Sequence, residues 1–356
     1  EKVIDWSYRS VHVMTDTAKL ALRMFYGRFP TRSYFYGCGT GGDQGLSEAQ
    51  RYPTDYDGII AGAAGESRVR TNVGLLWNWK SVHDNGGFPA AKLKMVSERA
   101  ASVCDAVDGV KDGIVDDPRR CNFDPGVLQC RAADRPDCLT LAQAAAVRNV
   151  YDGPRHPRNF DKIFAGLPKG TEATWDRFMG AVDPQRVEYW RQLVFNDPAW
   201  DFKTFDFDKD IAYAESKMAA ISPEGVDMNA FRQRGGKLLM YHGWVDPIVP
   251  GEEAIRYFTV AQQRNPGDFA RLYMVPGMGH CSNGLGSGGP APDQFDALTA
   301  LDQWFTSGQA PDKLIASHAT KGTVDRTRPL CTYPQVAKWD GTGNVDKAES
   351  FTCKAP

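Results

Sequence analysis

A glycine-rich turn near the start of the chain constrains the fold more than any other feature. The segment from Gly37 to Gly42 follows a short apolar strand pattern at 33–36 and leads into a helical pattern that ends near Arg51. A Gly-x-Ser-x-Gly elbow between a strand and a helix holds its serine on a strained turn, so that the hydroxyl projects into a site. Here the central residue is Gly39, which has no side chain. The turn predicts a strand–elbow–helix unit without its attacking atom.

Hydrophobic periodicity divides the rest of the chain into regular parts and one irregular part. Regular elements are expected as helices over 7–26, 252–263 and 293–306 and as strands over 56–62, 237–241 and 270–275. The segment between the strands at 56–62 and 237–241 is irregular and too long to be a structureless loop inside a compact domain. We therefore expect an α/β-hydrolase core with a mostly parallel sheet, formed by residues 1–65 and 231–356, and a large inserted lid domain at 66–230.

The core expected in this way has only about four strands. An α/β-hydrolase normally carries several strands ahead of its nucleophile, together with a loop that supplies one oxyanion N–H. This chain opens on the helix that precedes the elbow. We therefore expect that N-terminal strands of the core are missing from this chain, and that an N-terminal fragment completes it.

Two loops downstream of the elbow carry an acid and a base. Asp246 follows the strand at 237–241, and His280 follows the strand at 270–275. The order elbow, acid, base is that of α/β-hydrolases. His280 would remove the nucleophile's proton, Asp246 would hold the imidazole, and the N–H of Thr40 would be one oxyanion donor.

Each of these residues also has a simpler interpretation. Asp246 precedes a proline, as in many turns, and His280 could lie in a surface loop. His242 also ends a strand and is a rival for the base, although we interpret it as a core histidine. Thr40 is poorly placed as a replacement nucleophile because it is offset from the elbow apex. The common order and the strand-end positions together favour the catalytic interpretation.

The eight cysteines indicate the compartment. An even number favours disulfides and an oxidising environment, so we expect a secreted or periplasmic protein. Proximity favours three local pairs among the possible pairings: Cys104–Cys121, Cys130–Cys138 and Cys331–Cys353. Cys38 and Cys281 flank Gly39 and His280, and a bond between them would bring those two residues together. The alternatives are reduced core cysteines throughout, or an unpaired Cys38 and Cys281.

On these residues the chain resembles the tannase/feruloyl esterase family, which includes the enzyme that hydrolyses mono(2-hydroxyethyl) terephthalate. That family's motifs are Gly-Cys-Ser-Thr-Gly-Gly, His-Gly-x-x-Asp and Gly-x-x-His-Cys, which correspond here to 37–42, 242–246 and 277–281. The resemblance covers essentially the whole chain. It implies a serine esterase acting on aromatic carboxylic esters, with a disulfide between the cysteines beside nucleophile and base.

Two residues depart from the family's motifs. Gly39 stands where the family has serine, and Asp43 stands where it commonly has arginine. The first departure removes the ordinary mechanism, so we expect this form of the enzyme to be inactive. The alternative is a natural pseudoenzyme that binds aromatic acids or esters without hydrolysing them. The retained Asp246 and His280 argue for the first interpretation.

An aspartate-rich loop at 105–117 is a candidate metal site. Carboxylates with interleaved carbonyls and glycine turns suit Ca²⁺, but a solvated acidic turn explains the composition equally well. The resemblance implies a structural calcium in the lid at this motif. Its ligands would be the side chains of Asp105, Asp108 and Asp112 and the carbonyls of Val110 and Ile114.

The expected substrate is a small aromatic ester. Ile248 and Val249, just past the acid, would form an apolar wall, and Trp244 could contribute. Lid aromatics could close over a ring, although packing is their more common role; they are Trp175, Tyr189, Trp190, Phe195 and Trp200. The net charge is −2 with no basic run, and no apolar stretch is long enough to span a bilayer. Nucleic acid and membrane are therefore not expected as partners.

Overall fold

The core of the protein is a parallel four-stranded sheet in the order β1-β2-β3-β4. The computed structural model describes residues 2–221, 225–282 and 290–356. The strands are β1 (Tyr34–Cys38), β2 (Gly58–Gly62), β3 (Lys237–Gly243) and β4 (Ala270–Val275). All four expected strands are thus present. Because parallel strands point the same way, the segments that follow β1, β3 and β4 emerge at one edge of the sheet.

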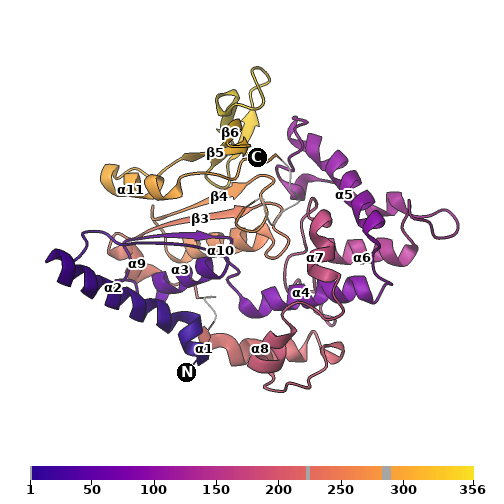
Figure 1. The fold of residues 1–356 in the computed structure, drawn as a ribbon, viewed down its shortest axis with the longest axis horizontal. Coiled ribbons are helices and arrows are strands. Elements are labelled where there is room, and N and C mark those ends of the chain that lie inside the picture. Colours follow the sequence, from indigo (N-terminus) through magenta and orange to yellow (C-terminus); the bar gives the residue numbers. More distant parts are fainter. Residues whose placement is uncertain (1, 222–224, 283–289) are drawn as a thin grey trace.

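Helices cover both faces of this sheet (Figure 1). One face carries α3 (Thr40–Arg51), α9 (Asn229–Gln233) and α10 (Gly251–Arg264), and the other carries α11 (Ala297–Ser307). Ile59 of β2 packs in the first cluster with Leu46, whereas its neighbour Ile60 packs in the second with Leu301. Both faces are buried, which explains why β2 is a continuous apolar run. The last helix begins at Ala297, later than expected, because Asp296 caps it through the N–H of Thr299.

The segment between β2 and β3 folds into helices beside the sheet (Figure 1). They are α4 (Arg68–His83), α5 (Ala90–Cys104), α6 (Leu141–Asp152), α7 (Trp175–Met179) and α8 (Lys209–Met218). Short 3-10 and π-helical turns connect them, including η2 (Asp105–Asp108) and η6 (Tyr189–Val194). Two apolar clusters of its own hold this segment together, one around Trp175 and one around Trp190.

The N-terminal helix is present, but its apolar side lies on the surface. It consists of α1 (Lys2–Ile4), η1 (Asp5–Arg9) and α2 (Ser10–Tyr26). Val11 is buried, whereas Met14 is 54% exposed and Phe25 is 81% exposed. Beyond Val11, most of the stripe that predicted an amphipathic helix is therefore not covered by any described part of the chain. The neighbouring strand β1 pairs only with β2 among the described strands.

The C-terminal part contains strands that the sequence patterns did not predict. They form two antiparallel pairs, β5 (Lys313–Thr320) with β6 (Thr323–Cys331) and β7 (Val336–Trp339) with β8 (Phe351–Lys354). These strands are short or rich in polar residues, so their periodicity is weak. The Cys331–Cys353 disulfide joins β6 to β8.

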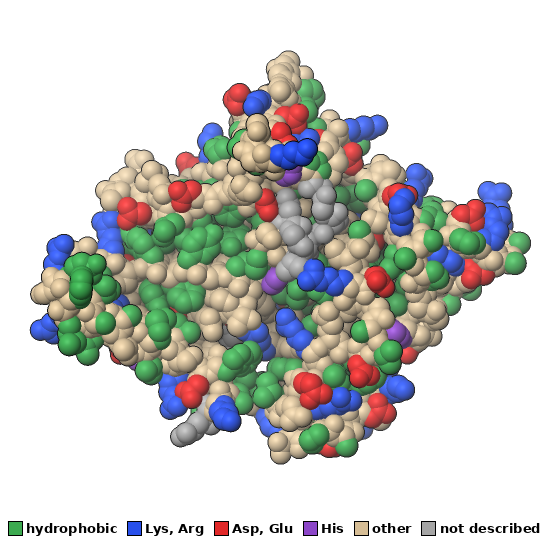
Figure 2. All heavy atoms as spheres, in the orientation of Figure 1, with side chains coloured by type: hydrophobic (Ala, Val, Ile, Leu, Met, Phe, Trp, Pro, Cys, Tyr) green, Lys and Arg blue, Asp and Glu red, His purple; other side chains and the backbone are tan. Residues whose placement is uncertain are grey.

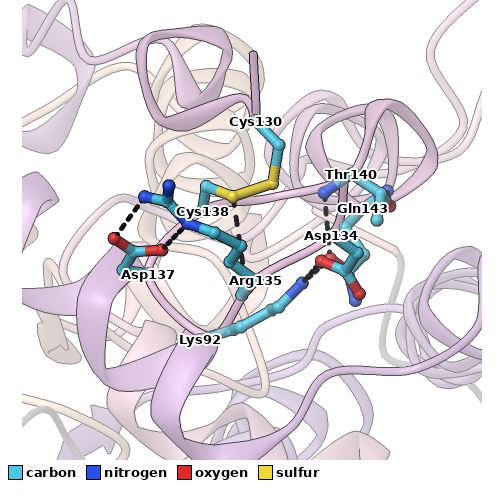
Figure 3. Close-up of a disulfide and its surroundings, with 8 residues drawn as sticks. All are labelled: Lys92, Cys130, Asp134, Arg135, Asp137, Cys138, Thr140 and Gln143. Carbon is cyan, nitrogen blue, oxygen red and sulfur yellow. Dashed lines mark hydrogen bonds and ion pairs between the residues drawn. A yellow bond between two sulfur atoms is a disulfide. The ribbon is translucent and has the colours of Figure 1, made fainter. Parts of the chain in front are cut away.

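All eight cysteines are paired, in the four combinations expected above. Figure 3 shows Cys130–Cys138, with the Arg135–Asp137 ion pair inside the loop that it closes. Next to it the buried ammonium group of Lys92 donates to Asp134 and to Gln143.

None of the described helices combines the length and the apolar character that crossing a membrane requires.

Candidate active site

The predicted elbow has a strained backbone at Gly39. Gly39 caps α3 with φ 60° and ψ −119°, a conformation that residues with a Cβ rarely adopt. Its N–H donates to the carbonyl of Gly62 at 2.9 Å, which ties the turn to β2. Gly42 is required by close approach, because a Cβ there would lie 2.3 Å from the same carbonyl oxygen. The turn therefore has the geometry that presents a side chain at residue 39 to the site.

Asp246 and His280 form a hydrogen-bonded pair at the carboxyl edge of the sheet. His280 Nδ1 lies 2.7 Å from Asp246 Oδ2. Asp246 Oδ1 accepts the N–H groups of Ile248 at 2.8 Å and Val249 at 3.0 Å, so the loop after β3 wraps around a fully buried carboxylate. Both residues follow strands whose ends are adjacent, because β3 pairs with β4.

The pair perturbs both of its members. Burial alone would raise the pKa of Asp246, but the charge of His280 and hydrogen bonds from two histidines outweigh it and hold the pKa below its ordinary range. Burial alone would lower the pKa of His280, but the Asp246 carboxylate outweighs it and the net shift is upward. His280 is therefore a stronger base than a free imidazole, held in one orientation.

The base faces the elbow. A Cβ added at Gly39 would lie 2.8 Å from His280 Nε2 and 3.8 Å from Cys281 Sγ. The Cys38–Cys281 disulfide, with its Cα atoms 5.9 Å apart, links the two loops. The structure thus brings together the three positions that the sequence predicted, residues 39, 246 and 280.

His242, the rival base, is occupied elsewhere. Its side chain is fully buried, and Nε2 lies 2.8 Å from the carbonyl oxygen of Val249 and 3.3 Å from Asp246 Oδ2. Because a carbonyl only accepts, Nε2 carries the proton. His242 therefore contacts Asp246 and the loop after β3, whereas His280 is the histidine next to Gly39.

The first turn of α3 is anchored by an ion pair that sequence reasoning did not find. Thr40 is the first residue of α3, so its N–H has no acceptor within the helix and suits an oxyanion. One turn on, the buried carboxylate of Asp43 accepts N–H groups of Gly65 and Glu66 and pairs with Arg68 at 2.7 Å. Arg68 therefore supplies a guanidinium group beside the elbow, next to the departure at Asp43.

A cavity of about 490 Å³ opens beside Thr40. Its lining includes Arg68 and Asn72 from α4 and Arg186, Tyr189 and Leu193 from the segment around η6. Among residues 2–221, 225–282 and 290–356, no carboxylate lies within ion-pairing distance of Arg186. Its charge lowers the pKa of His280, against the larger effect of Asp246. In Figure 2, Lys and Arg side chains gather beside a histidine near the centre of the face shown.

Comparison with known proteins identifies the family. The model of the family described as tannase and feruloyl esterase matches residues 1–354. The chain belongs to this family.

Relatives within the family include esterases of known and unknown substrate. An uncharacterized esterase of Xanthomonas campestris is 35% identical over 99% of this chain and 70% of its own length. The mono(2-hydroxyethyl) terephthalate hydrolase of Piscinibacter sakaiensis is 34% identical over 99% of this chain and 68% of its own. The crystal structure of feruloyl esterase B from Aspergillus oryzae superposes with a TM-score of 0.90 at 27% identity, over 98% of this chain and 75% of that one. The fold is therefore that of the family's α/β-hydrolases.

The predicted apolar wall of this family member is largely buried. Trp244 is 4% exposed, with Arg119 over its ring at 4.5 Å, and it lines a separate cavity of about 200 Å³. Val249 is also buried, and Ile248 is half-buried against the cluster around Trp175. None of these three lines the cavity beside Thr40.

The five aromatic residues expected to lie in a lid differ in their surroundings. Trp175 and Trp190 are fully buried, and Phe195 and Trp200 pack against the cluster around Trp190. Tyr189 is the one of the five that lines the cavity beside Thr40. Burial therefore separates side chains that sequence alone could not distinguish.

The aspartate-rich loop at 105–114 folds around its own backbone. Its carboxylates accept N–H groups as follows: Asp105 from Asp112 and Gly113, Asp108 from Val110, and Asp112 from Ile114. Arg328 of β6 also pairs with Asp112, so a protein cation neutralises part of the loop's charge. This is a partner that the sequence did not suggest.

The carboxylates of this loop fit Ca²⁺ in chemistry but stand apart in space. Burial raises the pKa of Asp108 and of Asp112, and the charge of a neighbouring loop aspartate adds to each shift. Among the described residues, the one group of His, Cys, Asp or Glu ligand atoms that all lie within 4.8 Å of one another is elsewhere, at His12, Asp16 and Asp55. The carboxylates of the loop therefore repel one another, and their oxygen atoms lie farther apart than the ligand atoms of His12, Asp16 and Asp55.

Proposed function

We propose that the chain is a carboxylic ester hydrolase of the feruloyl esterase and tannase type, acting on aromatic acid esters, whose serine-dependent reaction is blocked at Gly39. The observation that carries the proposal is the Asp246–His280 pair, which faces an elbow of catalytic geometry. With a serine at residue 39, its hydroxyl would lie beside His280 Nε2 and the N–H of Thr40 would face the developing oxyanion. Without that hydroxyl no acyl-serine can form.

The direct test is to restore the nucleophile. We expect Gly39→Ser to hydrolyse at least one of methyl ferulate, methyl gallate and mono(2-hydroxyethyl) terephthalate. The backbone already has the elbow conformation, so the imidazole needs to withdraw only by tenths of an ångström to admit the Cβ. The matched control is Gly39→Ser with His280→Gln, which should lose the restored activity. A folded Gly39→Ser variant that binds the free acids but turns over none of the esters would instead support the non-catalytic binding protein.

The cavity beside Thr40 favours an acid that carries a second negative charge, because Glu188, which also lines it, is neutralised by an ion pair with Arg191. Arg186 has no carboxylate partner among the described residues, and Arg68 lines the same cavity. A guanidinium group binds a carboxylate through paired, charge-assisted hydrogen bonds. We therefore propose that a monoester with a free carboxylate, such as mono(2-hydroxyethyl) terephthalate, is preferred over the neutral esters.

The preference is tested in the Gly39→Ser background. Arg186→Gln should raise KM for mono(2-hydroxyethyl) terephthalate about 10- to 100-fold, because a hydrogen bond to a charged group contributes about 1.5–3 kcal/mol. KM for methyl ferulate should stay the same. Arg135→Gln, which removes an exposed arginine from the Cys130–Cys138 loop, is the matched control. An equal effect on both esters would contradict the assignment.

We propose that the loop at 105–114 binds a structural Ca²⁺ through Asp105, Asp108 and Asp112 and the carbonyls of Val110 and Ile114. In support, burial and the charges of Asp108 and Asp117 raise the pKa of nearby Asp116 to about 7, a repulsion that a divalent cation would relieve. The carboxylates would need to move closer together around the ion. Elemental analysis of the purified protein should find calcium, and Asp108→Asn should reduce it. The control is Asp197→Asn, another loop aspartate that accepts the N–H two residues on.

We also propose that a further N-terminal fragment completes the core, with one strand on the free edge of β1 and apolar side chains over α2. No other described strand pairs with the outer edge of β1, and an open strand edge beside exposed Met14 and Phe25 is a surface that proteins normally cover. The mass of the protein purified from its source tests this. A single 39.3 kDa chain that is monomeric and folds alone would contradict it.

We propose a secreted or periplasmic location, because disulfides persist in oxidising compartments and all eight cysteines are paired. Expression in a reducing cytoplasm should give unfolded or insoluble chain, whereas periplasmic export should give the folded form.

A further inference from the structure

Gly39 provides no nucleophile, and among the described residues no donor is bonded to the free nitrogen of His280. His280 is held through Nδ1 by Asp246, so in its neutral form Nδ1 carries the proton and Nε2 is an acceptor. Within the described ranges of the chain, no group donates a hydrogen bond to Nε2. The His280 side chain as a whole is 14% exposed to solvent. The base therefore points its lone pair at the place from which a nucleophile would attack.

We propose that this chain hydrolyses activated esters by direct attack of water, with His280 as general base and without an acyl-enzyme. The inference rests on the proposed function, because it uses the same ester site. His280 Nε2 takes a proton from water while the water oxygen forms a bond to the ester carbonyl carbon. The carbonyl electron pair moves to its oxygen, which the N–H of Thr40 faces. As the intermediate collapses, the bond to the alcohol oxygen breaks and Nε2 returns the proton to the leaving alkoxide. The products are the acid and the alcohol, and the imidazole is neutral again.

Glycine is the residue that permits this reaction. A Cβ at residue 39 would lie 2.8 Å from Nε2. Even after the imidazole withdraws by tenths of an ångström, that Cβ stays in van der Waals contact with Nε2 and occupies the place of the attacking water, so alanine should block the reaction. A serine would put its own hydroxyl there and attack in place of water. Both the missing side chain and the retained Asp246–His280 pair are therefore needed for the water route.

The expected rate is low but measurable. A positioned general base contributes about 10²–10⁴-fold. An ester with a good leaving group, such as 4-nitrophenyl ferulate, makes such a rate visible without help from other parts of the site. The rate should increase as pH rises through the raised pKa of His280, because only the neutral imidazole accepts the proton.

The experiment compares variants of the chain on 4-nitrophenyl ferulate under single-turnover conditions, with folding checked by circular dichroism. We expect His280→Gln and Gly39→Ala each to lose at least about 100-fold of the rate above buffer. Two matched controls should keep it. His318→Gln breaks a different His–Asp pair, on the β5–β6 hairpin, and Gly308→Ala adds a Cβ at another glycine with positive φ, where it meets nothing within 4 Å.

Intact-mass analysis during turnover separates the inference from the proposed function. The unmodified chain should show no acyl adduct, whereas Gly39→Ser should accumulate one. An adduct on the unmodified chain, for example on Thr40, would overturn the water route. A rate that His280→Gln leaves unchanged would also overturn it, while activity of Gly39→Ser would leave the proposed function standing. If Gly39→Ser is inactive on every ester, the proposed function fails instead.

Discussion

Replacing Asp246 by asparagine tests the central pair most directly. The carboxylate is fully buried and both of its oxygens are in use, Oδ1 for the N–H groups of Ile248 and Val249 and Oδ2 for His280. Asparagine has the same shape and keeps an oxygen for the loop amides. Its NH₂ group then faces His280 Nδ1, which is itself a donor. The imidazole must therefore move its proton to Nε2 or lose the bond, and in either case the base is disabled.

The contacts of His280 predict how Asp246→Asn changes its pKa. Burial and the charge of Arg186 lower the pKa of His280, whereas Asp246, with a smaller contribution from Asp43, raises it. A hydrogen bond to a charged group contributes about 1.5–3 kcal/mol. At 1.36 kcal/mol per pKa unit, losing it should lower the pKa of His280 by about 1–2 units. The pKa should then fall below that of a free imidazole.

An NMR titration of the histidine Cε1–H resonances measures this shift. The resonance of His318, which pairs with Asp325 on the β5–β6 hairpin, serves as an internal reference. An unchanged pKa for His280 in Asp246→Asn would refute the assignment of the pair. In the Gly39→Ser background the same change should lower kcat by roughly 10⁴-fold, because the wrong tautomer cannot act as base.

The same pair predicts how stability depends on pH. The raised pKa of His280 contributes stability that is present below about pH 6.5 and lost as pH rises through the folded-state pKa. The lowered pKa of Asp246 contributes stability that is present above about pH 3.9 and lost as pH falls through the folded-state pKa. Denaturant unfolding should therefore show the largest destabilisation by Asp246→Asn between about pH 4 and pH 6.5. A destabilisation that is the same at pH 5 and pH 9 would contradict this.

Three further predictions concern the frame around the site. Replacing both Cys38 and Cys281 by alanine should lower the free energy of unfolding by up to about 5 kcal/mol, because the bond closes a loop with a sequence separation of 243 residues; a change below 1 kcal/mol would argue against that reasoning. Gly62→Ala should cost about 1–3 kcal/mol or more, since its Cβ would lie 2.1 Å from the ring of Tyr241, and an unchanged melting temperature would show that the contact relaxes freely. Excess EGTA should lower the melting temperature if the loop at 105–114 holds calcium, and Asp108→Asn should remove that sensitivity. A protein that contains no metal and whose melting temperature does not change in EGTA would contradict the calcium site.

Much of the site could be predicted because its parts are local. The elbow is a short run of glycines between a strand and a helix, and both Asp246 and His280 directly follow apolar strands. Parallel strands deliver such loops to one edge of a sheet, so their order along the chain is enough to predict that they meet. The disulfide partners were also predictable, because Cys38 and Cys281 each adjoin a residue of the site.

Other features depend on contacts between distant segments and left no local pattern. The β5–β6 strands are too polar to show a period, and nothing near Asp43 in the sequence points to Arg68 as its partner. The exposure of Phe25 could not be read from a stripe that only predicts a helix.

The sequence by itself determined the elbow, the order of acid and base, and the missing hydroxyl at Gly39, since these follow from residue identity and strand periodicity. Only the tertiary structure decided that Nε2 of His280 lies beside that position. It also decided that Arg186 lines the adjoining cavity without a carboxylate partner among the described residues, and that Trp244 is buried away from that cavity. The physical reason is that burial and ion pairing are properties of packed neighbours, and those neighbours come from segments far apart along the chain.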